Sequence, residues 1–67
     1  MLEISINGEA RRFDSALTLT QLLERLEMTG KKLAVEMNGE IVPKSQHATT
    51  PLNNGDQLEI VVAVGGG

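Results

Sequence analysis

The chain has 67 residues, a formal net charge of −3 and no cysteine, and these quantities already exclude several classes of protein. Such a length holds one domain, which needs an efficient apolar core because small domains bury a modest share of their surface. Without cysteine the chain has no disulfide and no thiolate metal site, a composition that fits a reducing cytoplasm. Its six lysines and arginines are scattered, and Phe is its one aromatic residue among Phe, Trp and Tyr, which argues against nucleic-acid binding. No apolar stretch approaches the length of a membrane span or a signal peptide, so we expect a cytoplasmic protein that does not bind membranes.

The first segment predicts a β-hairpin. Residues 2–6 (LEISI) alternate apolar and polar side chains, the pattern of a half-buried strand. Asn7 and Gly8 follow, and both residue types tolerate the positive φ that a tight hairpin turn requires. The return strand, residues 9–13, carries two arginines and is expected to be exposed, with Phe13 folding onto the core.

Residues 18–28 are predicted to form the one helix. Thr18 and Gln21 have the spacing of a capping box at its start. Gly30 is well placed to end it in a left-handed conformation. Four leucines at helical spacing define its apolar face: Leu19, Leu22, Leu23 and Leu26.

A second hairpin is predicted after the helix. Residues 33–37 alternate in the manner of a strand, and Asn38 and Gly39 repeat the turn signal of the first hairpin. Residues 40–42 return as a short strand, which Pro43 stops.

The last predicted element is a strand over residues 57–64. It follows a polar loop, residues 44–56, in which the sequence also allows a short helical turn. We expect a solvated His47 there and an Asp56 that caps its own turn. Its apolar density is typical of a strand at the centre of a sheet. One face is formed by alternate apolar residues: Leu58, Ile60, Val62 and Val64.

This order of elements predicts an α+β fold. A single amphipathic helix lying across a mixed sheet of about five strands is the simplest way to bury both apolar faces. The arrangement is the β-grasp, or ubiquitin-like, fold, in which the last strand lies parallel to the first at the sheet centre. We expect a single domain over residues 1–64 and a flexible glycine tail over residues 65–67.

The residues that carry catalysis are too sparse to predict an enzyme. Catalysis needs a nucleophile beside a base, or titratable groups whose pKa values are shifted apart. The chain has one histidine, and its acidic residues are spread over several predicted elements. No group has the spacing of a metal site or of a phosphate-binding loop. We therefore expect a non-enzyme that holds no metal and no permanent cofactor.

The chain ends with EIVVAVGGG, in which three glycines directly follow an apolar strand, and this pattern needs its own explanation. A frayed terminus is one interpretation, but these glycines follow the most apolar strand without a polar spacer. The other interpretation is that the α-carboxylate of Gly67 reacts. A tail without side chains can pass extended through a narrow channel into another protein's active site. There ATP can activate the carboxylate as an acyl-adenylate, and a sulfur nucleophile can displace AMP to leave a thiocarboxylate.

Four segments now show a resemblance that covers nearly the whole chain: ISINGE, LTQLLERL, LAVEMNGEIVP and, most specifically, NNGDQLEIVVAVGGG. The chain resembles the ThiS family of sulfur carriers in thiamine biosynthesis, within the MoaD/ThiS superfamily. The resemblance implies that an ATP-using, ThiF-like adenylyltransferase adenylates Gly67, that sulfur from a cysteine desulfurase route gives a thiocarboxylate, and that a ThiG-like thiazole synthase accepts the sulfur. Gly66 and Gly67 match the family's terminal diglycine, and Gly65 adds a glycine to the tail that threads into the partner.

Two side chains of the last strand, Val61 and Ala63, point away from the face that packs on the helix. Either a loop or an edge covers them, or they form an exposed apolar patch that docks the partner enzymes. In the second case, Glu59 beside them would set register and partner choice.

Three other functions stay open at this point. The small subunit of molybdopterin synthase uses the same tail chemistry with a different acceptor. The short length of this chain argues against that function, and so does the lack of an aromatic- and proline-rich segment before the glycines. A ubiquitin-like modifier would form isopeptide bonds to lysines through its tail. A plain interaction domain would carry the glycines incidentally.

Overall fold

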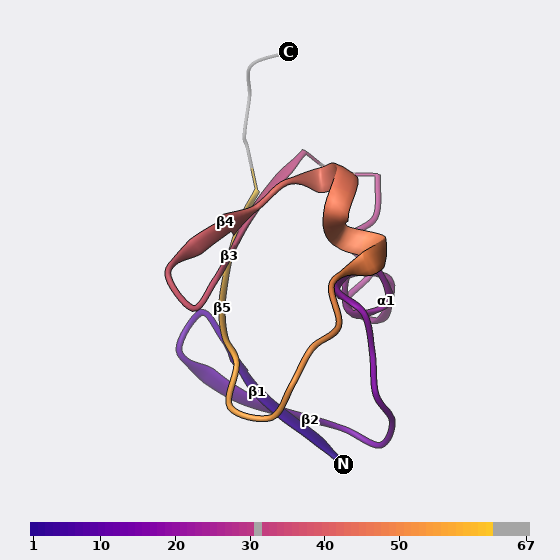
Figure 1. Ribbon diagram of the computed structural model, residues 1–67, viewed down its shortest axis with the longest axis vertical. Helices are drawn as coiled ribbons and strands as arrows, with labels where there is room; N and C mark the ends of the chain where they lie inside the picture. The colour runs from indigo at the N-terminus through magenta and orange to yellow at the C-terminus, as the bar shows by residue number, and fades with distance from the viewer. Residues whose placement is uncertain (31, 63–67) are drawn as a thin grey trace.

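A five-stranded sheet with one α-helix across one of its faces forms the fold in the computed structural model, which describes residues 1–30 and 32–62 (Figure 1). The strands are β1 (Leu2–Ile6), β2 (Glu9–Phe13), β3 (Leu33–Met37), β4 (Glu40–Val42) and β5 (Gln57–Val62). The helix α1 spans Leu19–Arg25, and a 3-10 helix spans Lys44–Thr49 within the region expected to be a loop. None of the described helices is long and apolar enough to cross a membrane.

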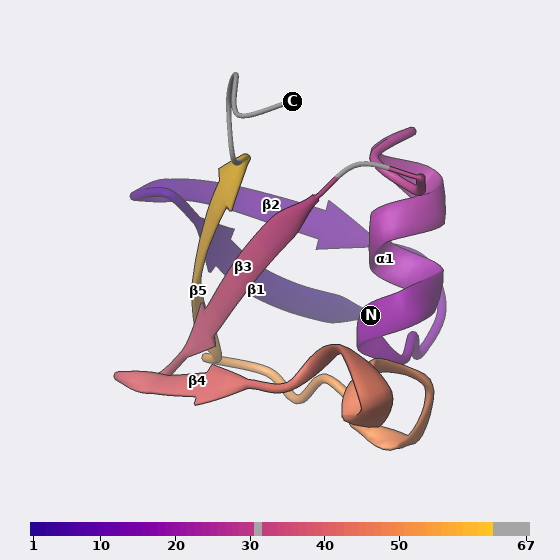
Figure 2. The same ribbon diagram turned by 90° about the horizontal axis from the view of Figure 1, so that it is seen from above.

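The strand order is β2-β1-β5-β3-β4, which puts the last strand at the centre of the sheet (Figures 1 and 2). β5 pairs with β1 in parallel and with β3 antiparallel, while each hairpin supplies one edge of the sheet. This confirms the expected β-grasp topology. The most apolar strand takes the position in which neighbours satisfy its backbone on both sides, as the hydrophobic pattern predicted.

Both hairpin turns are made by the Asn-Gly pairs. Asn7 and Asn38 have φ of 51° and 53°, and the glycines that follow have φ of 85° and 89°. A turn with positive φ at both central residues has a twist that matches that of the flanking strands. The two turn predictions are therefore confirmed, and they set the register of both hairpins.

The core lies between α1 and the facing side of the sheet. Alternate residues of β1 and β5 point into it, and Phe13 packs against its border. This alternation puts every second side chain of a strand on the buried face. The buried apolar residues are Leu2, Ile4, Ile6, Leu17, Leu19, Leu22, Leu23, Val35, Leu52, Leu58 and Ile60.

The start of α1 follows the sequence prediction. The Gln21 N–H donates to Thr18 Oγ1 at 3.2 Å, and the Thr18 N–H donates to Gln21 Oε1 at 2.9 Å. These two bonds form the capping box, which satisfies donors that have no partner inside the helix.

The predicted end of the helix was wrong, because α1 stops after Arg25 rather than at residue 28. Glu27 takes the left-handed conformation, with φ of 58°. Its N–H donates to Glu24 O at 3.1 Å, and the Met28 N–H donates to Leu23 O at 2.9 Å. This hydrogen-bond pattern is a Schellman motif, which brings Met28 back onto Leu23 and ends the helix earlier.

Candidate functional site: the base of the tail on strand β5

The strand that leads to the glycine tail is held unequally by its two neighbours. Its pairing with β3 runs from Met37↔Leu58 to Leu33↔Val62. Its pairing with β1 covers only Ser5↔Gln57 and Ile6↔Leu58. Backbone pairing with β1 therefore ends well before β5 does, and the remaining hydrogen bonds on that side must come from elsewhere.

The side chain of Asn7 takes over where the backbone of β1 turns away. Its Oδ1 accepts from the Ile60 N–H at 2.8 Å, and its Nδ2 donates to Ile60 O at 3.2 Å. Its own N–H donates to Leu58 O at 2.8 Å. One amide side chain thus replaces a further residue of β1, and it does so at a position whose left-handed backbone already bends into the turn.

Asn38, in the other turn, holds the start of the same strand. Its Oδ1 accepts from the Gln57 N–H at 2.9 Å, and its Nδ2 donates to Asp56 Oδ1 at 3.0 Å. Asp56 Oδ2 in turn accepts from the Asn53 N–H at 2.8 Å, which confirms the expected turn cap. The sequence predicted both asparagines only as turn residues, yet each also fixes β5.

The outward face of β5 is open to solvent. Val61 is 61% exposed, and Glu59 is exposed too, whereas Leu58 and Ile60 on the opposite face are buried. Of the two interpretations given for Val61, the structure supports an exposed apolar side chain. A single exposed apolar side chain is ordinary, so Val61 needs apolar neighbours before this face indicates a binding surface.

Four of the predicted site residues lie outside the described part of the chain: Ala63, Gly65, Gly66 and Gly67. The predicted boundary between residues 64 and 65 lies outside it as well. The described part therefore establishes the strand that leads to the tail, which is paired with β3 up to Val62 and held on the β1 side as far as Ile60.

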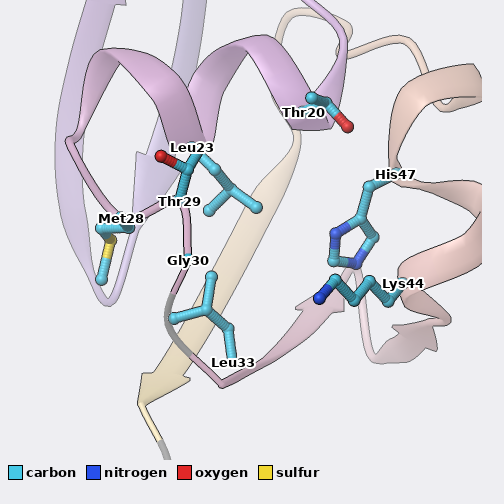
Figure 3. A pocket seen from close by; sticks show the side chains of 8 residues that line it. All are labelled: Thr20, Leu23, Met28, Thr29, Gly30, Leu33, Lys44 and His47. Atoms are coloured by element: carbon cyan, nitrogen blue, oxygen red, sulfur yellow. The ribbon is translucent and has the colours of Figure 1, made fainter.

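A cavity of about 180 Å³ lies on the helix side of the sheet (Figure 3). Leu23, Met28 and Leu33 give it an apolar lining, and Lys44 and His47 contribute its nitrogen atoms. Leu33 is the strand partner of Val62, so this cavity adjoins the end of β5.

The expected solvated state of His47 was wrong. The side chain is buried, with 7% exposed, and its Nε2 lies 3.0 Å from Val42 O. A carbonyl oxygen only accepts, so Nε2 carries a proton and donates to it. The 3-10 helix Lys44–Thr49 packs against α1 and turns this histidine inward, an outcome that a polar, turn-rich sequence does not signal.

Within residues 1–30 and 32–62, no three histidine, aspartate or glutamate side chains gather closely enough to hold a metal ion.

Comparison with known proteins agrees with this arrangement. The model of the ThiS family matches residues 4–67. The chain belongs to the ThiS family. A crystal structure of the thiamine biosynthesis protein ThiS from Geobacter metallireducens superposes with a TM-score of 0.84 at 29% identity, covering 98% of this chain and 100% of that one.

Two relatives of this chain differ greatly in length. It is 48% identical over 66 residues to a thiazole synthase of Paramagnetospirillum magneticum, which covers 98% of this chain but 20% of that protein. It is 30% identical to the sulfur carrier protein ThiS of Escherichia coli (strain K12), covering 98% of this chain and 100% of that protein. The chain thus spans about a fifth of the thiazole synthase and the whole of the carrier.

Proposed function

We propose that this ThiS-family chain is a sulfur carrier in thiamine biosynthesis, consumed and regenerated as a co-substrate rather than acting as an enzyme. The observation that carries the proposal is the occurrence of the same module, at 48% identity, inside a thiazole synthase. Joining two partners in one chain gives them a high effective concentration for each other. A carrier of the same family is therefore expected to deliver sulfur to a ThiG-like thiazole synthase.

The proposed chemistry takes place at the carboxylate of Gly67. In a ThiF-like adenylyltransferase, a carboxylate oxygen attacks the α-phosphorus of ATP, and pyrophosphate leaves. A sulfide sulfur, supplied through a cysteine desulfurase route, then adds to the acyl carbon, and AMP departs with the C–O bonding electrons. One oxygen of the carboxylate is thereby replaced by sulfur, and this thiocarboxylate is the group that the thiazole synthase receives.

The described structure supports this role through the way it presents the tail. β5, the strand that leads towards the tail, is anchored in the sheet by Asn7 and Asn38. Gly65 and Gly66 have no side chains, which suits passage through a narrow channel. From Val61 to Gly67 an extended chain reaches about 20 Å, so an enzyme that docks on Val61, Ala63 and Glu59 can hold its active site at that distance.

The chain lacks cysteine, which fits work in a reducing cytoplasm. No thiol of its own competes for the activated carboxyl group, so the sulfur must come from a partner.

Intact-mass measurement tests the proposal directly. After incubation with ATP, the adenylating partner and a sulfur donor, the mass is expected to show one oxygen replaced by sulfur, located at Gly67 by fragmentation. A variant with a C-terminal extension, which removes the free carboxylate of Gly67, is the matched control and is expected to stay unmodified. An unchanged mass with a partner that is active on its own carrier would refute the proposal, and lysine-linked conjugates in a lysate would point to a modifier instead.

A further inference from the structure

The face of the sheet that points away from α1 carries an apolar and acidic surface over β3, β4 and β5, which we call the outer patch: Ile41, Glu36, Glu59 and Val61. Ile41 is 64% exposed and Val61 is 61% exposed. These are two of the three large hydrophobic residues exposed in the described part of the chain, the third being Met1 at the N-terminus. The patch is therefore the main exposed apolar feature on the described sheet.

The strand register brings the four residues together. Glu36 is the direct partner of Ile41 on β4 and of Glu59 on β5. Directly opposed residues have Cβ atoms about 4.5–5.5 Å apart, so the two acidic side chains leave the sheet from neighbouring positions. Val61 follows two residues after Glu59 on the same face, which leaves the acidic pair between two exposed apolar side chains.

This acidic pair is not explained by stability, because like charges directly opposite each other destabilise a sheet. Elsewhere on the same face the chain does the opposite. Glu3 is opposed by Arg12, and Glu3 Oε2 lies 3.1 Å from Arg12 Nε. Neither Glu36 nor Glu59 forms an ion pair with another described residue. Within the described part of the chain, the two negative charges of the outer patch thus have no cationic partner.

A second copy of this chain does not fit the patch. A symmetric contact would bring the same surface of both copies together and would gather four carboxylates. A cation relieves the repulsion, and arginine fits better than lysine because its planar fork of donors can serve two carboxylates at once. The exposed sides of Ile41 and Val61 can then pack against the stem of that side chain.

The adenylating enzyme must bind the chain while the carboxylate of Gly67 is still unmodified, and its active site must lie within about 20 Å of Val61. We infer that Glu36 and Glu59 bind one arginine of the adenylating enzyme, with Ile41 and Val61 packing on either side of it. This inference rests on the proposed function, and it adds Glu36 and Ile41 to the docking face expected from the sequence.

The test is a double variant, Glu36→Gln with Glu59→Gln, and its matched control is Glu3→Gln on the same face. Pyrophosphate release is measured with the adenylating enzyme at increasing carrier concentrations, and binding is measured by calorimetry without ATP. The double variant is expected to raise KM for the carrier about tenfold, to leave kcat unchanged, and to flatten the dependence of KM on salt. It is also expected to unfold at a higher temperature than the unmodified chain, because the repulsion is gone, so weaker binding cannot come from unfolding.

Several outcomes would overturn the inference. These are an unchanged KM and salt dependence in the double variant, an equal effect of Glu3→Gln, or no binding of the unmodified chain at all. If the loss appears only against the thiazole synthase, the partner named here is wrong. Normal binding with no thiocarboxylate formed would refute the proposed function and leave this inference standing.

Discussion

Replacing the side-chain amide of Asn7 by a carboxyl group should weaken the anchorage of β5 in a way that depends on pH. In Asn7→Asp the acceptor to the Ile60 N–H, now at 2.8 Å, is kept. The donor to Ile60 O, now at 3.2 Å, is lost. The substitution preserves size, and aspartate tolerates the left-handed backbone as asparagine does, so the hydrogen bond is the main change.

The magnitude follows from that one exchange. Losing the bond costs about 1 kcal/mol, and leaving a partly buried carbonyl to face a carboxylate oxygen adds about 1–2 kcal/mol. We therefore expect the free energy of unfolding to fall by about 2–3 kcal/mol at neutral pH. For a chain of this length the total is roughly 3–10 kcal/mol, so the unfolding temperature should drop by about 10 °C or more.

The sign of the pH dependence can be stated in advance. The folded state disfavours the charged form of the introduced carboxyl group, so its pKa is raised above the unfolded value of about 3.9. The loss in free energy of unfolding caused by the substitution is then fully present above the pKa of the folded state, and it shrinks as the pH falls below that pKa. Once protonated, the group can again donate to Ile60 O.

Urea unfolding from about pH 3 to pH 8, compared at each pH with the unmodified chain, measures this effect. Hydrogen exchange of the Ile60 amide reports the same loss locally. Gln21→Glu is the matched control, because only the acceptor of Gln21 is used in the capping box, and it should change stability little. A deficit below about 0.5 kcal/mol at neutral pH, where surface changes usually fall, or one that is independent of pH, would refute the reasoning.

Three further outcomes follow from the same structure. Glu27→Gly should raise the free energy of unfolding by about 1 kcal/mol because φ is 58° there; Glu27→Ala should not, and equal urea midpoints for both would contradict this. Val61→Asp should lower kcat/KM for adenylation about tenfold while urea unfolding changes by less than about 0.5 kcal/mol, since the side chain is 61% exposed; normal adenylation or an unfolded variant would exclude the docking role. Leu58→Ala, at a position 1% exposed, should cost about 2–5 kcal/mol in thermal unfolding, and a smaller loss would show that the core can close around the gap.

The local patterns of the sequence were sufficient to predict the α-helix, the five strands and their order. Alternation in residues 2–6 and 57–64 predicted strands, the second of which the structure describes as far as Val62, and the two Asn-Gly pairs predicted both turns. Thr18 and Gln21 predicted the start of α1. These signals work because strand and helix periods, and the φ that each residue type allows, are properties of a few neighbouring residues. A single amphipathic helix and one dense apolar strand then leave few ways to bury both.

Errors arose where a local preference competes with packing. Gly30 is the better residue for a left-handed helix end, yet Glu27 takes that role, because the motif it forms brings Met28 onto Leu23. His47 lies in a sequence that reads as a solvated loop, yet the 3-10 helix turns it onto Val42 O. In both places, contacts made by the surrounding core outweigh the intrinsic preference of one residue.

By itself the sequence determined the β-grasp elements, the two faces of the first and last strands and the family to which the chain belongs. Only the tertiary structure decided which side chains meet across the sheet. Asn7 reaches Ile60 across 53 positions of sequence, and Glu36 lies opposite Glu59 through the pairing of β3 with β5. Such neighbours depend on the register of the whole sheet, and a shift of one residue would turn each side chain to the other face. The anchorage of the tail and the acidic pair beside it are therefore properties of the folded sheet rather than of any segment within it.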